Sequence, residues 1–189
     1  AGELAGSDTA VIFGLSSVDY QNLQLMDPDS IDAYTNLGCA ASLAANRVSY
    51  CLDLHGPSFV LDTACSSALV ALNAACESIR SGRSALAITG GVSLMLSPFQ
   101  WVGFSKAQML SRQGLCRAFD AAADGFVRSE GGGVLVIKPL DRACRDGDPI
   151  RAVIRATATN CDGRTQGLFL PSAQAQQTLL RDAYARAGI

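Results

Sequence analysis

Short apolar runs alternate along this chain with longer helix-like segments, and that order limits the folds open to it. The strand-like runs cover residues 9–15, 58–63, 85–89, 134–138 and 150–158. The helix-like segments cover residues 39–54, 66–81 and 172–187. A repeated strand–helix–strand order predicts a mainly parallel sheet with helices on both faces. The sequence therefore indicates an α/β fold.

Two segments stand out within this pattern. Residues 66–81 are apolar on nearly every face, which predicts a helix buried on all sides. Its exit is marked by Arg80 in the last turn and by Gly82 directly after. Residues 97–133 are irregular and glycine-rich, which is more typical of a functional loop region than of a linker. No repeat or linker divides the chain into two domains.

The composition excludes several classes of protein. Of the 189 residues, 49% are hydrophobic and 17% are charged, which predicts a packed interior. The net charge of -2, without a basic stripe, argues against a nucleic-acid partner. No apolar run approaches the roughly 20 residues of a membrane helix. The first residues do not resemble a secretory signal.

The cysteines suggest a reducing environment. The chain has 7 of them, odd in number and never in C-x-x-C spacing: Cys39, Cys51, Cys65, Cys76, Cys116, Cys144 and Cys161. A disulfide framework is not expected at this size, so we predict a reducing cytosol and mostly buried thiols. With only 1 histidine, a metal site is not expected either.

Cys65 differs from the other cysteines in its surroundings. It stands in LDTACSSALVAL, where a strand-like run passes directly into a helix-like one. Backbone N–H groups and the helix dipole at such a junction favour a thiolate, the form that acts as a nucleophile. Ala64, Ser66 and Ser67 are small enough to admit a substrate carbonyl. Cys65 is therefore a candidate nucleophile, and the alternative is a buried packing residue.

The only histidine, His55, is not expected to act as the base for Cys65. An extended run over residues 58–63 spans about 20 Å at roughly 3.3 Å per residue, so it separates the two side chains. We interpret His55 as a surface residue beside the Gly56-Pro57 turn. A thiol hydrolase is consequently disfavoured.

Several blocks together resemble a known family. They read GPSFVLDTACSSALVAL, GGVSLMLSP, FSKAQMLS, CRAFDAAADGFVRSEGGGVLVIKPLDRA and NCDGRTQG. In this order they resemble the ketosynthase (β-ketoacyl-acyl-carrier-protein synthase) domain of modular type I polyketide synthases, from about Thr9 to Gly188. The resemblance implies a thiolase-like fold with αβαβα layers. Residues 1–189 would form its N-terminal half and the start of its C-terminal half.

The resemblance also implies a chemistry and partners. Cys65 would accept an acyl group from the phosphopantetheine arm of an acyl carrier protein. A carbanion from a decarboxylating malonyl-type carrier thioester would then attack that acyl group, so the enzyme would be an acyltransferase. The family forms homodimers, with the strand before Cys65 pairing across the dimer axis. No cofactor is expected to bind this segment.

Further residues match family positions. Phe126 matches a position lining the active site, and Phe104 and Met109 fall in a segment that shapes the acyl pocket. For Met109, ordinary core packing is an equal alternative. Four charged residues match a patterned loop, where we expect paired charges to hold the structure: Asp120, Asp124, Arg128 and Glu130. A turn near the join of the two halves is expected at Asn160, Asp162 and Gly163.

The resemblance leaves part of the chemistry outside this sequence. The family uses two histidines and a lysine that would follow Ile189, and a first segment that would precede Ala1. Residues 1–189 are therefore interpreted as a partial ketosynthase domain that does not condense substrates alone. One alternative is a non-catalytic segment for dimerisation or carrier-protein docking. Another is the condensing domain of a fatty-acid synthase.

Overall fold

The computed structural model describes residues 4–189 and contains one four-stranded sheet flanked by helices. The strands are β1 (Ala10–Gly14), β2 (Ser58–Leu61), β3 (Ala87–Ser93) and β4 (Gly131–Ile137). The α-helices are α1 (Asp19–Leu25), α2 (Thr35–Cys39), α3 (Leu43–Leu52), α4 (Ser67–Arg80), α5 (Phe99–Lys106), α6 (Leu140–Asp146) and α7 (Ala173–Ala187). Two short 3-10 helices complete the set, η1 (Pro28–Ser30) and η2 (Ala64–Ser66).

The sheet has the strand order β2-β1-β3-β4. β1 pairs in parallel with both β2 and β3, which confirms the predicted parallel βαβ arrangement. β4 pairs antiparallel with β3, so the sheet is mixed. The chain reverses between Ser93 and Gly131, and these two residues face each other at the end of the ladder.

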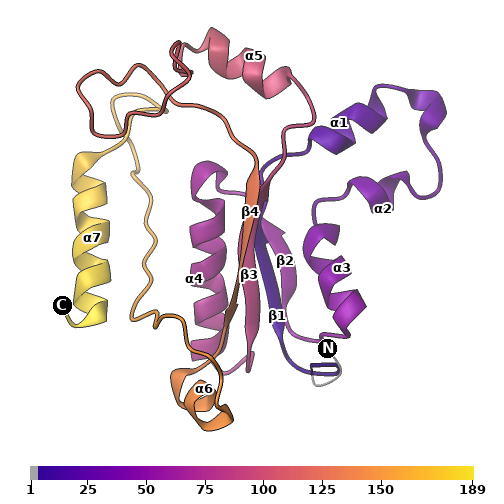
Figure 1. The fold of residues 1–189 in the computed structure, drawn as a ribbon, viewed down its shortest axis with the longest axis vertical. Helices are drawn as coiled ribbons and strands as arrows, with labels where there is room; N and C mark the ends of the chain where they lie inside the picture. Colours follow the sequence, from indigo (N-terminus) through magenta and orange to yellow (C-terminus); the bar gives the residue numbers. More distant parts are fainter. Residues whose placement is uncertain (1–3) are drawn as a thin grey trace.

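Helices cover both faces of the sheet, as the sequence predicted. In Figure 1, α4 lies on one face of the sheet and α1 to α3 lie on the other. Alternating side chains of the central strands supply two cores. Ala10 and Ile12 pack with Ala71 and Ala75 of α4, while Val11 packs towards α3. The α4 interface is built largely from alanine, which allows the helix to approach the sheet closely.

Two glycines set the closest approach between the sheet and α4. A Cβ atom on Gly14, at the end of β1, would lie 2.4 Å from the backbone carbon of Ser67. A Cβ atom on Gly91, in the adjacent strand, would lie 2.8 Å from the Cβ of Ala68. The first turn of α4 therefore rests on the backbone of β1 and β3, with no room for a larger residue at either position.

The predicted strand over residues 150–158 is wrong. These residues have no regular secondary structure and follow the turn after α6. Their apolar residues suit a strand, but a strand needs a neighbouring strand to accept and donate its backbone hydrogen bonds. Side chains fasten this segment instead, since Arg80 and Arg186 both donate to Thr157, each at 3.3 Å.

Three other predictions need correction. The helix expected over residues 39–54 forms only as α3, Leu43–Leu52, because Cys39 ends the separate helix α2 and Ala40 is extended; alanine propensity is a weak determinant beside tertiary packing. The region 97–133 contains α5 and the first part of β4. The helix α4 forms as predicted but is not buried on all sides, since Leu69 is 72% exposed on the side away from the sheet.

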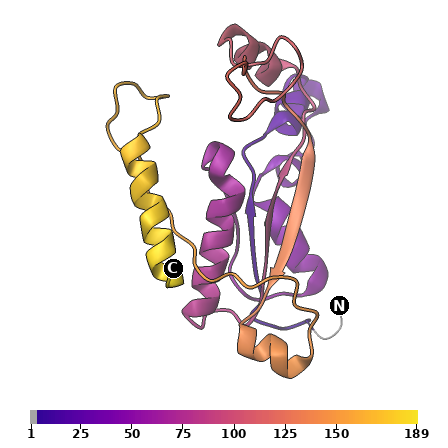
Figure 2. The same cartoon turned by 60° about the vertical axis from the view of Figure 1, so that its left-hand side comes forward.

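Large apolar surfaces remain open on two elements. The side chains of Val134, Leu135 and Val136 in β4 are all exposed. The helix α7 contains no buried residue, and Figures 1 and 2 show it beyond α4, on the side away from the sheet.

Among residues 4–189, no helix is both long and apolar enough to cross a membrane.

We predict that Gly14→Ala destabilises the protein by about 1–3 kcal/mol, because the new methyl group overlaps the backbone of α4. Chemical denaturation followed by circular dichroism measures the change. Gly38→Ala is the matched control: nothing lies within 4 Å of a Cβ there, and alanine suits the helix α2 better than glycine. Equal stability of the Gly14→Ala variant and the unsubstituted protein would contradict the close approach described above.

Candidate active site

Cys65 lies on a tight turn between β2 and α4. It is the middle residue of η2, and α4 begins two residues later at Ser67. The preceding residue, Ala64, has a φ of 55°, a left-handed conformation that is unfavourable for a residue with a side chain. The Cys65 side chain is exposed. The alternative interpretation of Cys65 as a buried packing residue is therefore wrong for this chain.

Hydroxyl groups hold the turn in this conformation. The Ser67 hydroxyl donates to the carbonyl of Ala64 at 2.7 Å and accepts from the backbone N–H of Thr63 at 2.8 Å. The Ser66 hydroxyl donates to the carbonyl of Thr63 at 2.9 Å. The Asp62 carboxylate accepts from the N–H of Ala64 at 2.8 Å. The residues flanking Cys65 thus satisfy the backbone of the strained turn and leave the thiol unencumbered.

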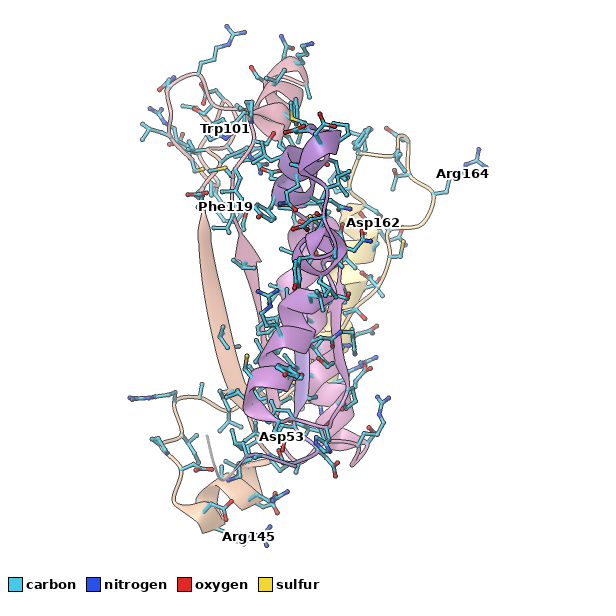
Figure 3. The ribbon with its side chains drawn as sticks, turned by 90° about the vertical axis from the view of Figure 1, so that its right-hand side faces the viewer. Asp53, Trp101, Phe119, Arg145, Asp162 and Arg164 are labelled. Carbon is cyan, nitrogen blue, oxygen red and sulfur yellow. The ribbon has the colours of Figure 1, made fainter. Side chains whose placement is uncertain are left out.

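The turn lies at the edge of the sheet where the parallel strands end. Ligand sites in α/β proteins lie at this carboxyl edge. The helix α5 and the connection over residues 107–130 lie at the same end of the molecule (Figure 1). In Figure 3, Trp101 of α5 and Phe119 of the connection lie together near one end, while Asp53 lies near the other.

Phe104 and Phe126 are brought together, as expected for two residues of one pocket. Their ring centroids lie 5.5 Å apart with an interplanar angle of 81°, an edge-to-face contact. Phe126 is fixed by its backbone, which donates to the carbonyl of Met109 at 3.0 Å and accepts from the N–H of Ser111 at 2.9 Å. The Met109 side chain is 48% exposed, so the alternative of core packing for Met109 is wrong.

The charged residues of the connection are structural, but they do not pair with one another. Asp124 accepts from the Ser111 hydroxyl at 2.6 Å, and Asp120 accepts from the N–H of Ala122 at 2.8 Å. The Ser111 hydrogen bond holds the pKa of Asp124 below its usual value. Within residues 4–189 no ion pair joins these side chains. Backbone amides and neutral side chains are near enough to satisfy them locally.

Arg128 and Glu130 contact the region around α5. The Arg128 guanidinium donates to Gln100 at 2.6 Å and lies over the ring of Phe104, 4.8 Å from its centroid. Glu130 accepts from the backbone N–H of Met95 at 2.7 Å. The sequence analysis identified Arg128 only as a structural charge. The signal for its stacking role was the spacing of Phe126 and Arg128, which places both on one side of an extended segment.

His55 is remote from Cys65, in agreement with the sequence prediction. Its Nε2 lies 3.1 Å from the carboxylate of Asp53, which Figure 3 shows far from Trp101 and Phe119. Its backbone N–H donates to the carbonyl of Ser7 at 2.8 Å. The strand β2 separates His55 from the thiol. His55 is thus a surface residue at the amino end of β2.

The prediction that most thiols are buried is wrong. Of the seven cysteines only Cys76 is buried, Cys39 is partly buried and the other five are exposed. Burial raises the pKa of the Cys76 thiol, an effect partly opposed by Arg80. Among residues 4–189 no three histidine, cysteine or acidic side chains gather as a metal site would require. Exposure alone does not separate Cys65 from the other four exposed cysteines. Its position on the turn at the carboxyl edge of the sheet does.

A cavity of about 550 Å³ lies on the face of the sheet opposite α4. Its walls combine the ends of β1 and β3 with residues of α1 and α3, including Leu15, Leu94 and Arg47. Neither Cys65 nor the pair Phe104 and Phe126 lines it. No local pattern in the sequence predicts this cavity, since its walls come from segments distant in the chain.

The segment around Asp162 is tied to α7 but forms no hydrogen-bonded turn at residues 160–163, where one was expected; the chain bends at Arg164 instead. Gly163 has a φ of 67°, and the Asp162 carboxylate accepts from the backbone N–H of Ser172 at 2.8 Å. The Asn160 amide donates to the carbonyl of Ala175 at 2.8 Å. Ser172 caps α7 by accepting from the N–H of Ala175 at 3.2 Å. These contacts orient the start of α7 and lie away from Cys65.

Comparison with known proteins gives a consistent result. A family model described as beta-ketoacyl synthase, N-terminal domain, matches residues 1–143. The chain is 52% identical over 184 residues to reducing polyketide synthase AFT16-1 of Alternaria alternata, covering 97% of this chain and 8% of that protein. It is 48% identical over 186 residues to polyketide synthase ThaG of Burkholderia thailandensis, covering 98% of this chain and 3% of that protein.

Solved ketosynthase structures share the fold. The ketosynthase from module 6 of the bacillaene synthase of Bacillus subtilis 168 matches with a TM-score of 0.89 at 38% identity. That match covers 98% of this chain and 31% of the ketosynthase chain. The oxazolomycin ketosynthase domain OzmH KS7 of Streptomyces albus JA3453 matches with a TM-score of 0.89 at 37% identity, over 100% of this chain and 33% of the other.

We predict that Ser67→Ala lowers the free energy of unfolding by about 1–3 kcal/mol. The buried hydroxyl satisfies two backbone groups of the turn, and alanine leaves both without a partner. Urea denaturation measures the loss. Ser105→Ala, in the exposed part of α5, is the control and should change stability by less than about 0.5 kcal/mol. A loss no larger than that of the control would show that the turn does not depend on this hydroxyl.

We predict that Ser111→Ala destabilises the connection over residues 107–130 in a pH-dependent manner. The lowered pKa of Asp124 means that its hydrogen bond to Ser111 stabilises the folded state when the carboxyl is ionised. This stabilisation is present at pH values above the ordinary pKa of aspartate. It is lost as the pH falls through the lowered pKa of Asp124. Hydrogen exchange of residues 107–130 at neutral and acidic pH measures it. A difference between the variant and the unsubstituted protein that does not shrink in acid would contradict the assignment.

Proposed function

Because this chain belongs to the β-ketoacyl synthase family, we propose that it forms the acyl-accepting part of a polyketide ketosynthase. The chain spans about a third of the length of the solved ketosynthase chains and under a tenth of the curated relatives. The reaction, the substrates and the partners of the complete domain are therefore part of the proposal. Cys65 is the nucleophile in it.

The observation that supports the proposal best is the position of Cys65. Its exposed thiol stands on a strained turn at the start of a 14-residue helix, at the carboxyl edge of the parallel strands. The positive end of the helix dipole lies there, and backbone N–H groups of the first turn lack intrahelical acceptors. The same end of α4 therefore suits both a nucleophilic sulfur and a developing oxyanion.

Acyl transfer to Cys65 begins the reaction. The Cys65 thiolate attacks the thioester carbonyl of an acyl group carried on phosphopantetheine. A new carbon–sulfur bond forms, and the carrier thiol leaves with the proton that the Cys65 thiol gave up. The oxygen of the tetrahedral intermediate carries a negative charge that backbone N–H donors stabilise. The half-buried rings of Phe104 and Phe126 offer an apolar surface for the acyl chain.

Condensation is the second step of the proposed reaction. A malonyl-type carrier thioester loses carbon dioxide, and the resulting carbanion attacks the acyl carbonyl on Cys65. A carbon–carbon bond forms and the Cys65 thiolate is released. His55, the only histidine in the sequence, lies too far from Cys65 to assist this step. We therefore assign decarboxylation to groups outside residues 1–189, as the family resemblance implies.

The proposed partners are an acyl carrier protein and a second copy of the chain. β2 is an edge strand of the sheet, and no strand among residues 4–189 pairs with the outer edge of Ser58–Leu61. A two-fold pairing of this edge with its counterpart would join two sheets and protect both edges. The free and mostly exposed thiols suit a reducing compartment, so we propose a cytoplasmic location.

We predict that Cys65→Ala abolishes acyl loading in a complete ketosynthase domain that carries these residues. Incubation with an acyl N-acetylcysteamine thioester, followed by intact-mass measurement, detects the acyl adduct. Cys144→Ala is the matched control, since Cys144 is also exposed but lies in α6 at the other end of the sheet. The control should load normally. An acyl adduct that persists in the Cys65→Ala variant would refute Cys65 as the nucleophile.

A further inference from the structure

The segment between β3 and α5 is fastened by side chains from distant parts of the chain. The Ser17 hydroxyl donates to the carbonyl of Leu94 at 3.2 Å, and Glu130 accepts from the N–H of Met95 at 2.7 Å. Asp19 is 5% exposed, and its carboxylate accepts from the backbone N–H groups of Leu96 and Ser97, both at 3.1 Å. Each polar contact lies just before α5. The start of α5 therefore has a fixed position relative to the sheet.

Arg128 reaches from the chain before β4 to this fixed helix. One of its terminal nitrogens donates to the side-chain oxygen of Gln100 in the first turn of α5, at 2.6 Å. The guanidinium carbon lies 4.8 Å from the centroid of the Phe104 ring, one turn further along the helix. The Phe104 ring in turn meets the ring of Phe126 edge to face, at 5.5 Å. Arg128, Phe104 and Phe126 thus form one continuous stack, called the Arg–Phe stack below.

The guanidinium is held in the stack at a cost to its own hydrogen bonding. The Nε atom of Arg128 is buried and has no hydrogen-bond partner among the described residues. Leaving a buried donor unsatisfied is unfavourable, and an apolar side chain would fill the space without that penalty. Only a planar cation such as the guanidinium can both hydrogen-bond to Gln100 and lie over the Phe104 ring. An apolar side chain supplies neither interaction.

We propose that Arg128 is a positioning residue for the acyl group: it fixes the Phe104 ring against Phe126 and so sets the shape of the surface that receives the acyl chain. This inference rests on the proposed function, in which that surface serves the acyl group bound to Cys65. A fixed ring presents a rigid wall that favours short acyl chains. A ring released from the guanidinium can turn aside and admit longer ones.

The test measures the choice between two acyl donors in a complete ketosynthase domain. Acetyl and hexanoyl N-acetylcysteamine thioesters are offered separately, and the rate of acyl adduct formation on Cys65 is followed by intact mass. In Arg128→Gln we expect the hexanoyl-to-acetyl rate ratio to rise about fivefold, the size of a cation–π contact at a partly buried site. Gln100→Leu frees the guanidinium without removing it, and we expect the ratio to rise in the same direction.

Arg117→Gln is the matched control for this test. Arg117 also donates to a glutamine, Gln113, at 2.7 Å, belongs to the same connection and is partly buried like Arg128, but it stacks on no ring among residues 4–189. Its rate ratio should stay within about twofold of the unsubstituted protein. Arg128→Lys keeps the charge but loses the planar fork, so its ratio should fall between those of Arg128→Gln and the unsubstituted protein.

The outcomes separate this proposal from the one on which it rests. An unchanged rate ratio in Arg128→Gln and Gln100→Leu, with acyl loading still on Cys65, would overturn the positioning role and leave the proposed function intact. An equal shift in Arg117→Gln would overturn it as well. If Arg128→Gln does not fold, Gln100→Leu decides the question. No adduct on the unsubstituted protein, or an adduct that survives Cys65→Ala, would instead overturn the proposed function.

Discussion

The contact between the backbone of the central strands and the first turn of α4 determines the rest of this structure. Gly14 and Gly91 leave the strand backbones bare at the points where α4 begins. The helix can therefore start directly above the ends of β1 and β3, with Ser67 buried between them. Only a tight reversal of the chain joins β2 to a helix in that position. The left-handed conformation of Ala64 supplies that reversal, and Cys65 follows it at the exposed corner.

The same contact explains which groups around Cys65 are rigid. Ser66, Ser67 and Asp62 direct their oxygen atoms back to the turn, so the backbone that presents the thiol is fully held by its neighbours. The aromatic contact of α5, at the same end of the molecule, is built differently (Figure 1). Phe104 and Phe126 come from two separate segments and are joined through side-chain contacts and short backbone bridges. The exposed Cys65 therefore stands on a fixed corner, whereas the aromatic contact joins the helix α5 to the chain before β4.

The sequence predicted those elements whose formation depends on nearby residues. The helix over residues 66–81 with its exit at Gly82, the helix over residues 172–187, and the strand–turn–helix junction at Cys65 all depend on local signals, and all are confirmed. The predicted strand over residues 150–158 failed because a strand requires a partner that no local pattern specifies. The exposure of five cysteines was missed for a related reason: burial depends on which surfaces meet, and thiols are small enough to suit either environment.

The pairing of Ser93 with Gly131 has a consequence for how such a chain can vary. The chain over residues 94–130 leaves the sheet after Ser93 and returns to it at Gly131, directly opposite. The chain between them can therefore change in length without shifting the register of β3 and β4 or the turn that carries Cys65. One pair of facing residues thus marks the boundary between the fixed sheet and a connection whose length the sheet does not restrict.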